Sequence, residues 1–297
     1  MAITIKGDQF QWKGRPIRLA GSHTWNTVQS MAGERIGIDK ITGNFTKLWT
    51  IETKGLVASN SLWGSNTSGF IKVDNVPWKK DGSLNPAYYD NLDEVVKRAG
   101  KRDMITMISL FEGSIQDIFD QAWENHPFNG LGPEDHDEVH TKGKWNQYQR
   151  AHVKRVVNTL EKHDNVMYEV GNELMSSSVP WFQKQVVKWI KKWTDKPVGV
   201  SYARGIRPSN GRQETWMKHT GADFILPEGS TRDVPWFKGA AIRDSDHDRP
   251  LFSPLTSFQE SWRKGWGLLL MDGMNGTFLR NQESMASAKA FIKDVLA

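Results

Sequence analysis

The order of segments along this chain predicts an α/β fold, a closed (β/α)8 TIM barrel preceded by a short N-terminal β-hairpin. Apolar, strand-like segments recur eight times, and segments with helical periodicity separate most of them. Strands that are joined through helices cannot pair by tight antiparallel turns, so we expect a parallel sheet. Eight such units in 297 residues favour a closed barrel, and we expect residues 1–297 to form a single domain.

Residues 3–17 have the pattern of a hairpin that leads into the barrel. A turn at Gly7 separates Ile3–Ile5 from Phe10–Trp12, and a second turn at Gly14 precedes the first barrel strand. The eight barrel strands are predicted at Ile17–Gly21, Phe45–Thr50, Met104–Phe111, Val166–Val170, Val198–Tyr202, Phe224–Leu226, Leu251–Leu255 and Leu268–Met271.

Helix signals fill the spaces between these strands. Asn85 and Pro86 form a cap residue and a first-turn proline, and apolar residues then recur at helical spacing until Gly100. The stretch Asn125–Gly143 is rich in Gly, Pro and charge, which indicates a long loop after the third strand rather than a domain boundary. Further helices are predicted around Tyr148–Leu160, Pro180–Trp193 and Phe291–Val295.

Composition argues against several classes of function. The net charge of +5 is small, and lysines such as Lys188 and Lys191 are spread over predicted helix surfaces, so we expect no nucleic-acid partner. Without cysteine the chain has no disulfide, thiolate metal site or cysteine nucleophile. No apolar run approaches the ~20 residues of a membrane span, and no signal peptide is visible. We therefore expect a soluble monomer with no membrane partner, and the sequence does not indicate its location.

The segment Val166–Glu173 carries the strongest functional signal. An apolar strand ends in Gly171, Asn172 and Glu173, so an amide and a carboxylate emerge where barrels of this kind have their active sites. Other strand ends bring further side chains to the same mouth. The candidate substrate-binding residues are His23, Trp25, Lys47, Trp49, Glu112, Asn172, Tyr202 and Asp272, and the candidate catalytic residues are Glu173 and Glu228.

These residue types suit the hydrolysis of a glycosidic bond. One protonated acid must donate to the leaving oxygen, and a second carboxylate must act as nucleophile or base. Glu173 is the candidate acid, because its apolar neighbours favour the protonated form, and Asn172 would bind a sugar hydroxyl beside it. We expect Glu228, at the end of the sixth strand, to be the second carboxylate, with Glu260 and Asp272 as alternatives.

Several further segments form an ordered pattern along nearly the whole chain. They are Pro16–Asn26, Lys47–Thr50, Leu110–Gly113, His126–Asn129, Val139–Thr141 and Tyr168–Glu173. In these segments the chain resembles a clan A glycoside hydrolase of the cellulase-like (β/α)8 type, and the Asn-Glu pair that ends the fourth strand is the most specific of them. The resemblance implies that Glu173 is the acid/base residue and that the substrate is an oligosaccharide or another small molecule.

Two departures from this pattern suggest an altered active site. Such enzymes usually have Arg where this chain has Lys47, and their seventh strand ends in an acidic nucleophile or an Asp-rich stretch. The predicted seventh strand, Leu251–Leu255, is followed by no acid before Glu260. An engineered site is therefore an alternative hypothesis. Glu173 or Glu228 would then abstract a proton from carbon in a Kemp-type elimination, or Lys47 would form a Schiff base as in an aldolase.

Two further interpretations remain open. A barrel that keeps its tryptophans but lacks a second carboxylate would bind carbohydrate without cleaving it. The loop between the third strand and the next helix also contains residues of metal-ligating types, but without regular spacing, so we expect no metal and no cofactor. We interpret them as solvated loop polarity or as groups that hydrogen-bond the loop to the barrel. These residues are His126, Asp135, His136, Asp137 and His140.

Overall fold

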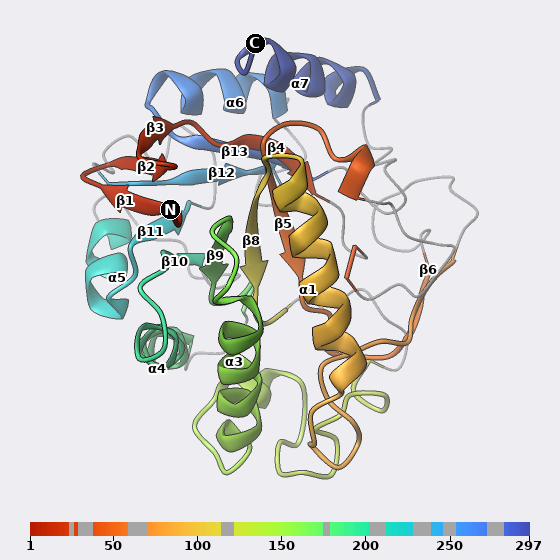
Figure 1. Ribbon diagram of the computed structural model, residues 1–297. Coiled ribbons are helices and arrows are strands. Elements are labelled where there is room, and N and C mark those ends of the chain that lie inside the picture. Colours follow the sequence, from red (N-terminus) through yellow and green to blue (C-terminus); the bar gives the residue numbers. More distant parts are fainter. Residues whose placement is uncertain are drawn as a thin grey trace.

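The computed structural model describes residues 1–23, 27–28, 38–58, 70–113, 122–174, 179–201, 212–227, 239–245, 254–271 and 282–297. Within these residues eight strands form one parallel sheet in the order β11-β10-β9-β8-β5-β4-β13-β12 (Figure 1). A parallel bridge between Ile225 and Ala241 joins its two ends and makes it a barrel, as predicted. The strands are β4 (Ala20–His23), β5 (Phe45–Trp49), β8 (Ile105–Ser109), β9 (Val166–Glu169), β10 (Val198–Ser201), β11 (Phe224–Leu226), β12 (Ile242–Asp244) and β13 (Gly267–Met271).

In the described part of the chain, helices connect most of the strands and cover the outside of the barrel (Figure 1). They are α1 (Pro86–Lys101), α3 (Asn146–Leu160), α4 (Val179–Lys191), α5 (Arg212–Thr220), α6 (Pro254–Arg263) and α7 (Gln282–Asp294), with short 3-10 helices η1 (Ile38–Lys40) and η2 (Asp137–His140). In α1, Pro86 begins the helix and an apolar stripe that includes Leu92 and Val96 joins the main core. Asn85 holds the cap position, but its side chain donates to the carbonyl oxygen of Val76 instead of capping.

The N-terminal hairpin is part of a three-stranded antiparallel sheet, β1 (Thr4–Lys6), β2 (Gln9–Trp12) and β3 (Arg15–Ile17). The predicted turns are present, since Gly7 and Gly14 have φ angles of 65° and 77°, which glycine adopts without steric cost. Phe10 packs edge-on against Phe224, with ring centroids 5.7 Å apart. The sheet therefore covers the end of the barrel where the strands begin.

The prediction of the seventh barrel strand was wrong. Residues 254–263 are helix α6, and residues 251–253 lie outside the described part of the chain. The seventh strand is β12, in which Arg243 and Asp244 are both fully buried. A buried strand is recognised in a sequence by its run of apolar residues. β12 has no such run, because two of its three residues are charged. The expected absence of an acid before Glu260 was therefore wrong as well, because this strand ends in Asp244 and Glu260 lies within α6.

Two further features concern the connections. The antiparallel pair β6 (Gly55–Ala58) and β7 (Phe70–Val73) was not predicted from the sequence. The predicted long loop over residues 125–143 is present, with η2 as its one regular element. In the described part of the chain no helix combines the length and apolarity that crossing a membrane requires.

Candidate active site

Lys47 lies at the centre of a buried polar network at the mouth of the barrel. This lysine belongs to β5 and is fully buried. Its Nζ lies 2.7 Å from Asn172 Oδ1, 3.1 Å from Glu169 Oε2 and 3.3 Å from Asp244 Oδ2. Burying the two carboxylates without a counter-charge would cost several kcal/mol, and Lys47 supplies that charge. A single ammonium thus connects the ends of the fourth and seventh barrel strands. We call His23, Lys47, Glu169, Asn172 and Asp244 the Lys47 network.

His23 and Trp49 form the wall beside Asp244. Nε2 of His23 lies 3.3 Å from Asp244 Oδ1, while its Nδ1 accepts a hydrogen bond of 2.8 Å from Trp49 Nε1. A neutral His23 therefore carries its proton on Nε2, facing the carboxylate. The His23 and Trp49 rings stack with centroids 5.4 Å apart. Trp49 is only 2% exposed, so it packs into the wall and does not lie open as a platform for a flat ligand.

The backbone brings Asn172 and Glu112 together. Gly113 N donates to the carbonyl oxygen of Asn172 at 2.8 Å, and Asn172 Nδ2 donates to Glu112 Oε1 at 3.4 Å. A side chain on Gly113 would begin 2.1 Å from the carbonyl oxygen of Glu173, so only glycine allows this approach. Both polar atoms of the Asn172 side chain thus bind within the protein, where they orient Lys47 and Glu112.

Glu173 has an unusual backbone conformation. Its φ angle of 45° lies in the left-handed region, which residues with a Cβ rarely adopt. Lys13 and Asp103 also have positive φ angles, but both are exposed turn residues. Glu173 is partly exposed, whereas Asn172 is buried. Backbone strain of this kind concentrates at functional sites, and here it accompanies a carboxylate with access to solvent.

The predicted site residues fall into two groups. Trp25, Tyr202, Glu228 and Asp272 lie outside the described residues. The others gather at the mouth: His23, Lys47, Trp49, Glu112 and Asn172 form one connected set, and Glu173 follows Asn172 in the chain.

Sequence reasoning missed two acids of this network. Glu169 is the one charge within the apolar segment 166–170, and Lys47 is the one charge within β5. Isolated opposite charges in two buried strands would have predicted their pairing. Asp244 gave no such signal, because its strand was not recognised.

A second polar cluster lies in the loops that follow β5 and β8. We call Glu52, His126, His136 and His140 the histidine cluster. All four are buried, so the interpretation as solvated loop polarity was wrong for these histidines, although Asp135 and Asp137 are exposed. Three of them, Glu52, His126 and His136, each offer one ligand atom, and these three atoms lie within 4.8 Å of one another. Such a grouping could hold a metal ion.

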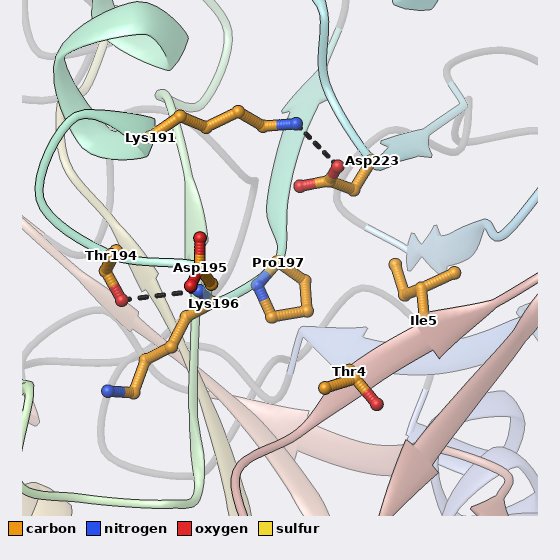
Figure 2. A pocket seen from close by; sticks show the side chains of 8 residues that line it. All are labelled: Thr4, Ile5, Lys191, Thr194, Asp195, Lys196, Pro197 and Asp223. Atoms are coloured by element: carbon orange, nitrogen blue, oxygen red, sulfur yellow. Dashed lines mark hydrogen bonds and ion pairs between the residues drawn. The ribbon is translucent and has the colours of Figure 1, made fainter.

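A surface pocket of about 600 Å³ lies at the other end of the barrel, where the strands begin (Figure 2). Its two lysines have acidic partners: Lys191 Nζ lies 2.6 Å from Asp223 Oδ1, and Lys196 Nζ lies 2.9 Å from Glu161 Oε2. None of the strand-end acids described above lines it, so it is separate from the candidate active site. Its lining consists of Thr4, Ile5, Lys191, Thr194, Asp195, Lys196, Pro197 and Asp223.

Comparison with solved structures places this architecture among known folds. An endo-1,4-β-mannanase from Rhizomucor miehei aligns with a TM-score of 0.64 at 12% identity, over 100% of this chain and 99% of that one. A glycoside hydrolase family 5 mannosidase from Rhizomucor miehei aligns with a TM-score of 0.62 at 10% identity, over 99% and 97% of the two chains. The chain has the fold of a clan A glycoside hydrolase.

Endo-glycoceramidase II from Rhodococcus sp. shares this clan A fold at a TM-score of 0.55 and 10% identity, over 95% of this chain and 80% of that one. Comparison of the sequence with protein-family models and with curated proteins gives no match. The resemblance to clan A is confirmed at the level of the fold, and the activity has to be argued from the site.

Proposed function

We propose that this protein hydrolyses glycosidic bonds, with Glu173 as general acid/base and Asp244 as nucleophile. One observation carries the proposal: Lys47 Nζ contacts both Asn172 and Asp244, which brings the Asn-Glu end of β9 and the acidic end of β12 to one point. The clan A resemblance assigns the acid/base residue and the nucleophile to these two strand ends. Asp244 therefore replaces Glu228 as our candidate for the second carboxylate.

The surroundings of the two carboxylates suit different roles. Asp244 is fully buried and has Lys47 and His23 beside its two oxygens, which favours the ionised form that a nucleophile requires. Glu173 has access to solvent, so it can protonate a leaving oxygen and later activate a water molecule. In a retaining hydrolase the two carboxyl groups lie about 5–5.5 Å apart, and the nucleophile forms a covalent glycosyl-enzyme intermediate.

The alternatives differ in what they require of the same residues. A Schiff base needs Lys47 as a neutral amine, but its contacts with Glu169 and Asp244 favour the ammonium form, which cannot attack a carbonyl group. A Kemp-type elimination or a binding-only barrel would leave aryl glycosides intact. Turnover of a glycoside therefore separates the proposed reaction from all three alternatives.

The test is hydrolysis of a panel of aryl β-glycosides. Aryl β-mannosides come first, because two of the similar structures are a mannanase and a mannosidase by name. Glu173→Gln is expected to lower kcat by about 10²–10⁴-fold, the usual contribution of a general acid. Glu94→Gln, which changes an exposed residue of α1, is the matched control and should retain full activity. No turnover across the panel, or full activity of Glu173→Gln, would contradict the proposal.

A further inference from the structure

The histidine cluster contains a grouping of ligand-type side chains that the proposed reaction does not use. We propose that Glu52, His126 and His136 bind one divalent transition-metal ion of the Zn²⁺ type. Glu52 follows β5, and the two histidines lie between β8 and α3, so the ion would join two loops at the barrel mouth. Each residue offers one ligand atom, and these three atoms lie within 4.8 Å of one another.

The three residues are buried without the hydrogen bonds that burial usually requires. Exposed fractions are 0% for Glu52 and 2% for each histidine. Among the described residues, neither carboxylate oxygen of Glu52 and neither Nε2 atom of the two histidines has a hydrogen-bond partner. The nearest approach is 3.5 Å, between His126 Nε2 and Glu52 Oε2. Buried polar atoms are nearly always satisfied, and a shared metal ion would satisfy this group at once.

The protonation states favour binding of a cation. Burial lowers the pKa of His136 to about 4 and the pKa of His126 well below its usual value, so both rings are neutral near pH 7 and can act as ligands. Burial, with a smaller contribution from Glu112, raises the pKa of Glu52. A divalent ion would offset this penalty and favour the carboxylate form, which is the form that binds a metal.

The donor set indicates the class of metal. Two imidazoles and one carboxylate, with no thiolate in the chain, suit Zn²⁺ and Co²⁺ better than Mg²⁺ or Ca²⁺, which prefer oxygen ligands. His140 is a candidate fourth ligand, because its ring centroid lies 5.7 Å from that of His136 and its Nε2 is also without a hydrogen-bond partner among the described residues. Ligand atoms at about 2.0–2.1 Å from a tetrahedral Zn²⁺ lie roughly 3.3 Å apart, so the site must contract slightly on binding.

His126 sets a condition on the geometry. Its Nδ1 accepts a hydrogen bond of 3.1 Å from Phe128 N, so the neutral ring carries its proton on Nε2. Coordination through Nε2 moves that proton to Nδ1 and breaks the bond to Phe128. Glu52 and His136 are therefore the stronger anchors of the proposed site.

The experiment is a titration of the full chain, stripped with EDTA, with Zn²⁺ by calorimetry and with Co²⁺ by visible absorption. We expect one ion per chain, a rise in Tm, and a Co²⁺ spectrum typical of nitrogen and oxygen ligands. Glu52→Gln and His136→Ala should each weaken binding by more than the ~10–100-fold that loss of an outer-shell partner costs. His219→Ala, which changes an exposed histidine of α5, should bind like the parent chain.

Two results would overturn the proposal. The first is a failure of the parent chain to bind one Zn²⁺ ion per chain. The second is binding that Glu52→Gln leaves unchanged, or that His219→Ala weakens as much as His136→Ala does. Glu52→Gln preserves the shape of the side chain, and its circular dichroism spectrum confirms folding if His136→Ala does not fold. These readouts involve no glycoside, so this proposal and the proposed hydrolase can fail separately.

Discussion

The Lys47 network and the histidine cluster are close together in the barrel mouth, yet they bury charged groups in different ways. Glu112 connects them, since it accepts a hydrogen bond from Asn172 and adds to the effect of burial in raising the pKa of Glu52. In the Lys47 network, two buried carboxylates face an ammonium from the same chain. In the histidine cluster, a buried carboxylate faces imidazoles that burial keeps neutral. In the first group a lysine of the chain supplies positive charge, whereas among the described residues of the second group no cation faces Glu52, and a metal ion would supply one.

Removing the central cation should have the largest effect. Lys47→Met leaves Glu169 and Asp244 buried without their counter-charge, and breaking a buried ion pair in this way costs about 3–5 kcal/mol. The free energy of unfolding from urea titration measures the loss. Lys188→Met, at an exposed position of α4, should stay within about 0.5 kcal/mol of the parent chain. Equal effects of the two variants would mean that the Lys47 network does not support the fold.

Acid is expected to destabilise the folded protein, because the buried histidines are neutral there and become protonated in the unfolded chain. Burial lowers the pKa of His152 from 6.5 to about 3, so the unfolded chain takes up this proton before the folded chain does. Stability is therefore lost as pH falls from about 6.5 towards 3, with about 3 kcal/mol attributable to this residue at pH 4. His152→Gln keeps a polar partner for Tyr89 and should make the decline in unfolding free energy between pH 7 and pH 4 shallower. An unchanged slope would contradict the assignment.

The smallest expected effect is that of Glu52→Gln in the histidine cluster. Without metal, this change should stabilise the protein, whereas loss of Lys47 from the Lys47 network should destabilise it. Burial raises the pKa of Glu52, so its contribution to stability is present below the unfolded pKa of about 4.5 and lost as pH rises through the folded value. In metal-free protein at pH 8, Glu52→Gln should therefore raise the free energy of unfolding, by about 1 kcal/mol. With saturating Zn²⁺ the same change should destabilise the protein. Thermal melts with EDTA and with Zn²⁺ measure both, and destabilisation under both conditions would contradict an unpartnered carboxyl group.

Prediction from the sequence succeeded where burial follows apolar patterning. β9 was recognisable from a largely apolar run with Glu169 as its one charge, and Asn172 and Glu173, which follow it, could be placed at the mouth from their position alone. β12 was not recognisable, because its charged residues are stabilised by partners far away in the sequence: Arg243 Nε donates to Ser257 Oγ, and Asp244 contacts Lys47.

The burial of the histidines also depends on tertiary contacts. The loop over residues 125–143 has the polar composition of an exposed segment, and nothing in its spacing indicates a buried cluster. His140 is buried because Phe111 and Phe182 pack against its ring, with centroids 6.1 Å and 5.1 Å away. Phe111 follows β8 and Phe182 lies in α4, so both contacts form only when the barrel is assembled.

Azide rescue of alanine variants tests the two assigned carboxylates most directly. Azide should restore turnover of an activated aryl glycoside by Asp244→Ala and give a glycosyl azide of inverted configuration, because the anion replaces the missing nucleophile. With Glu173→Ala it should give a glycosyl azide of retained configuration, because it attacks the covalent intermediate. Glu228→Ala should need no rescue. Full activity of Asp244→Ala without azide, or inverted product from Glu228→Ala in its place, would contradict the assignment of Asp244.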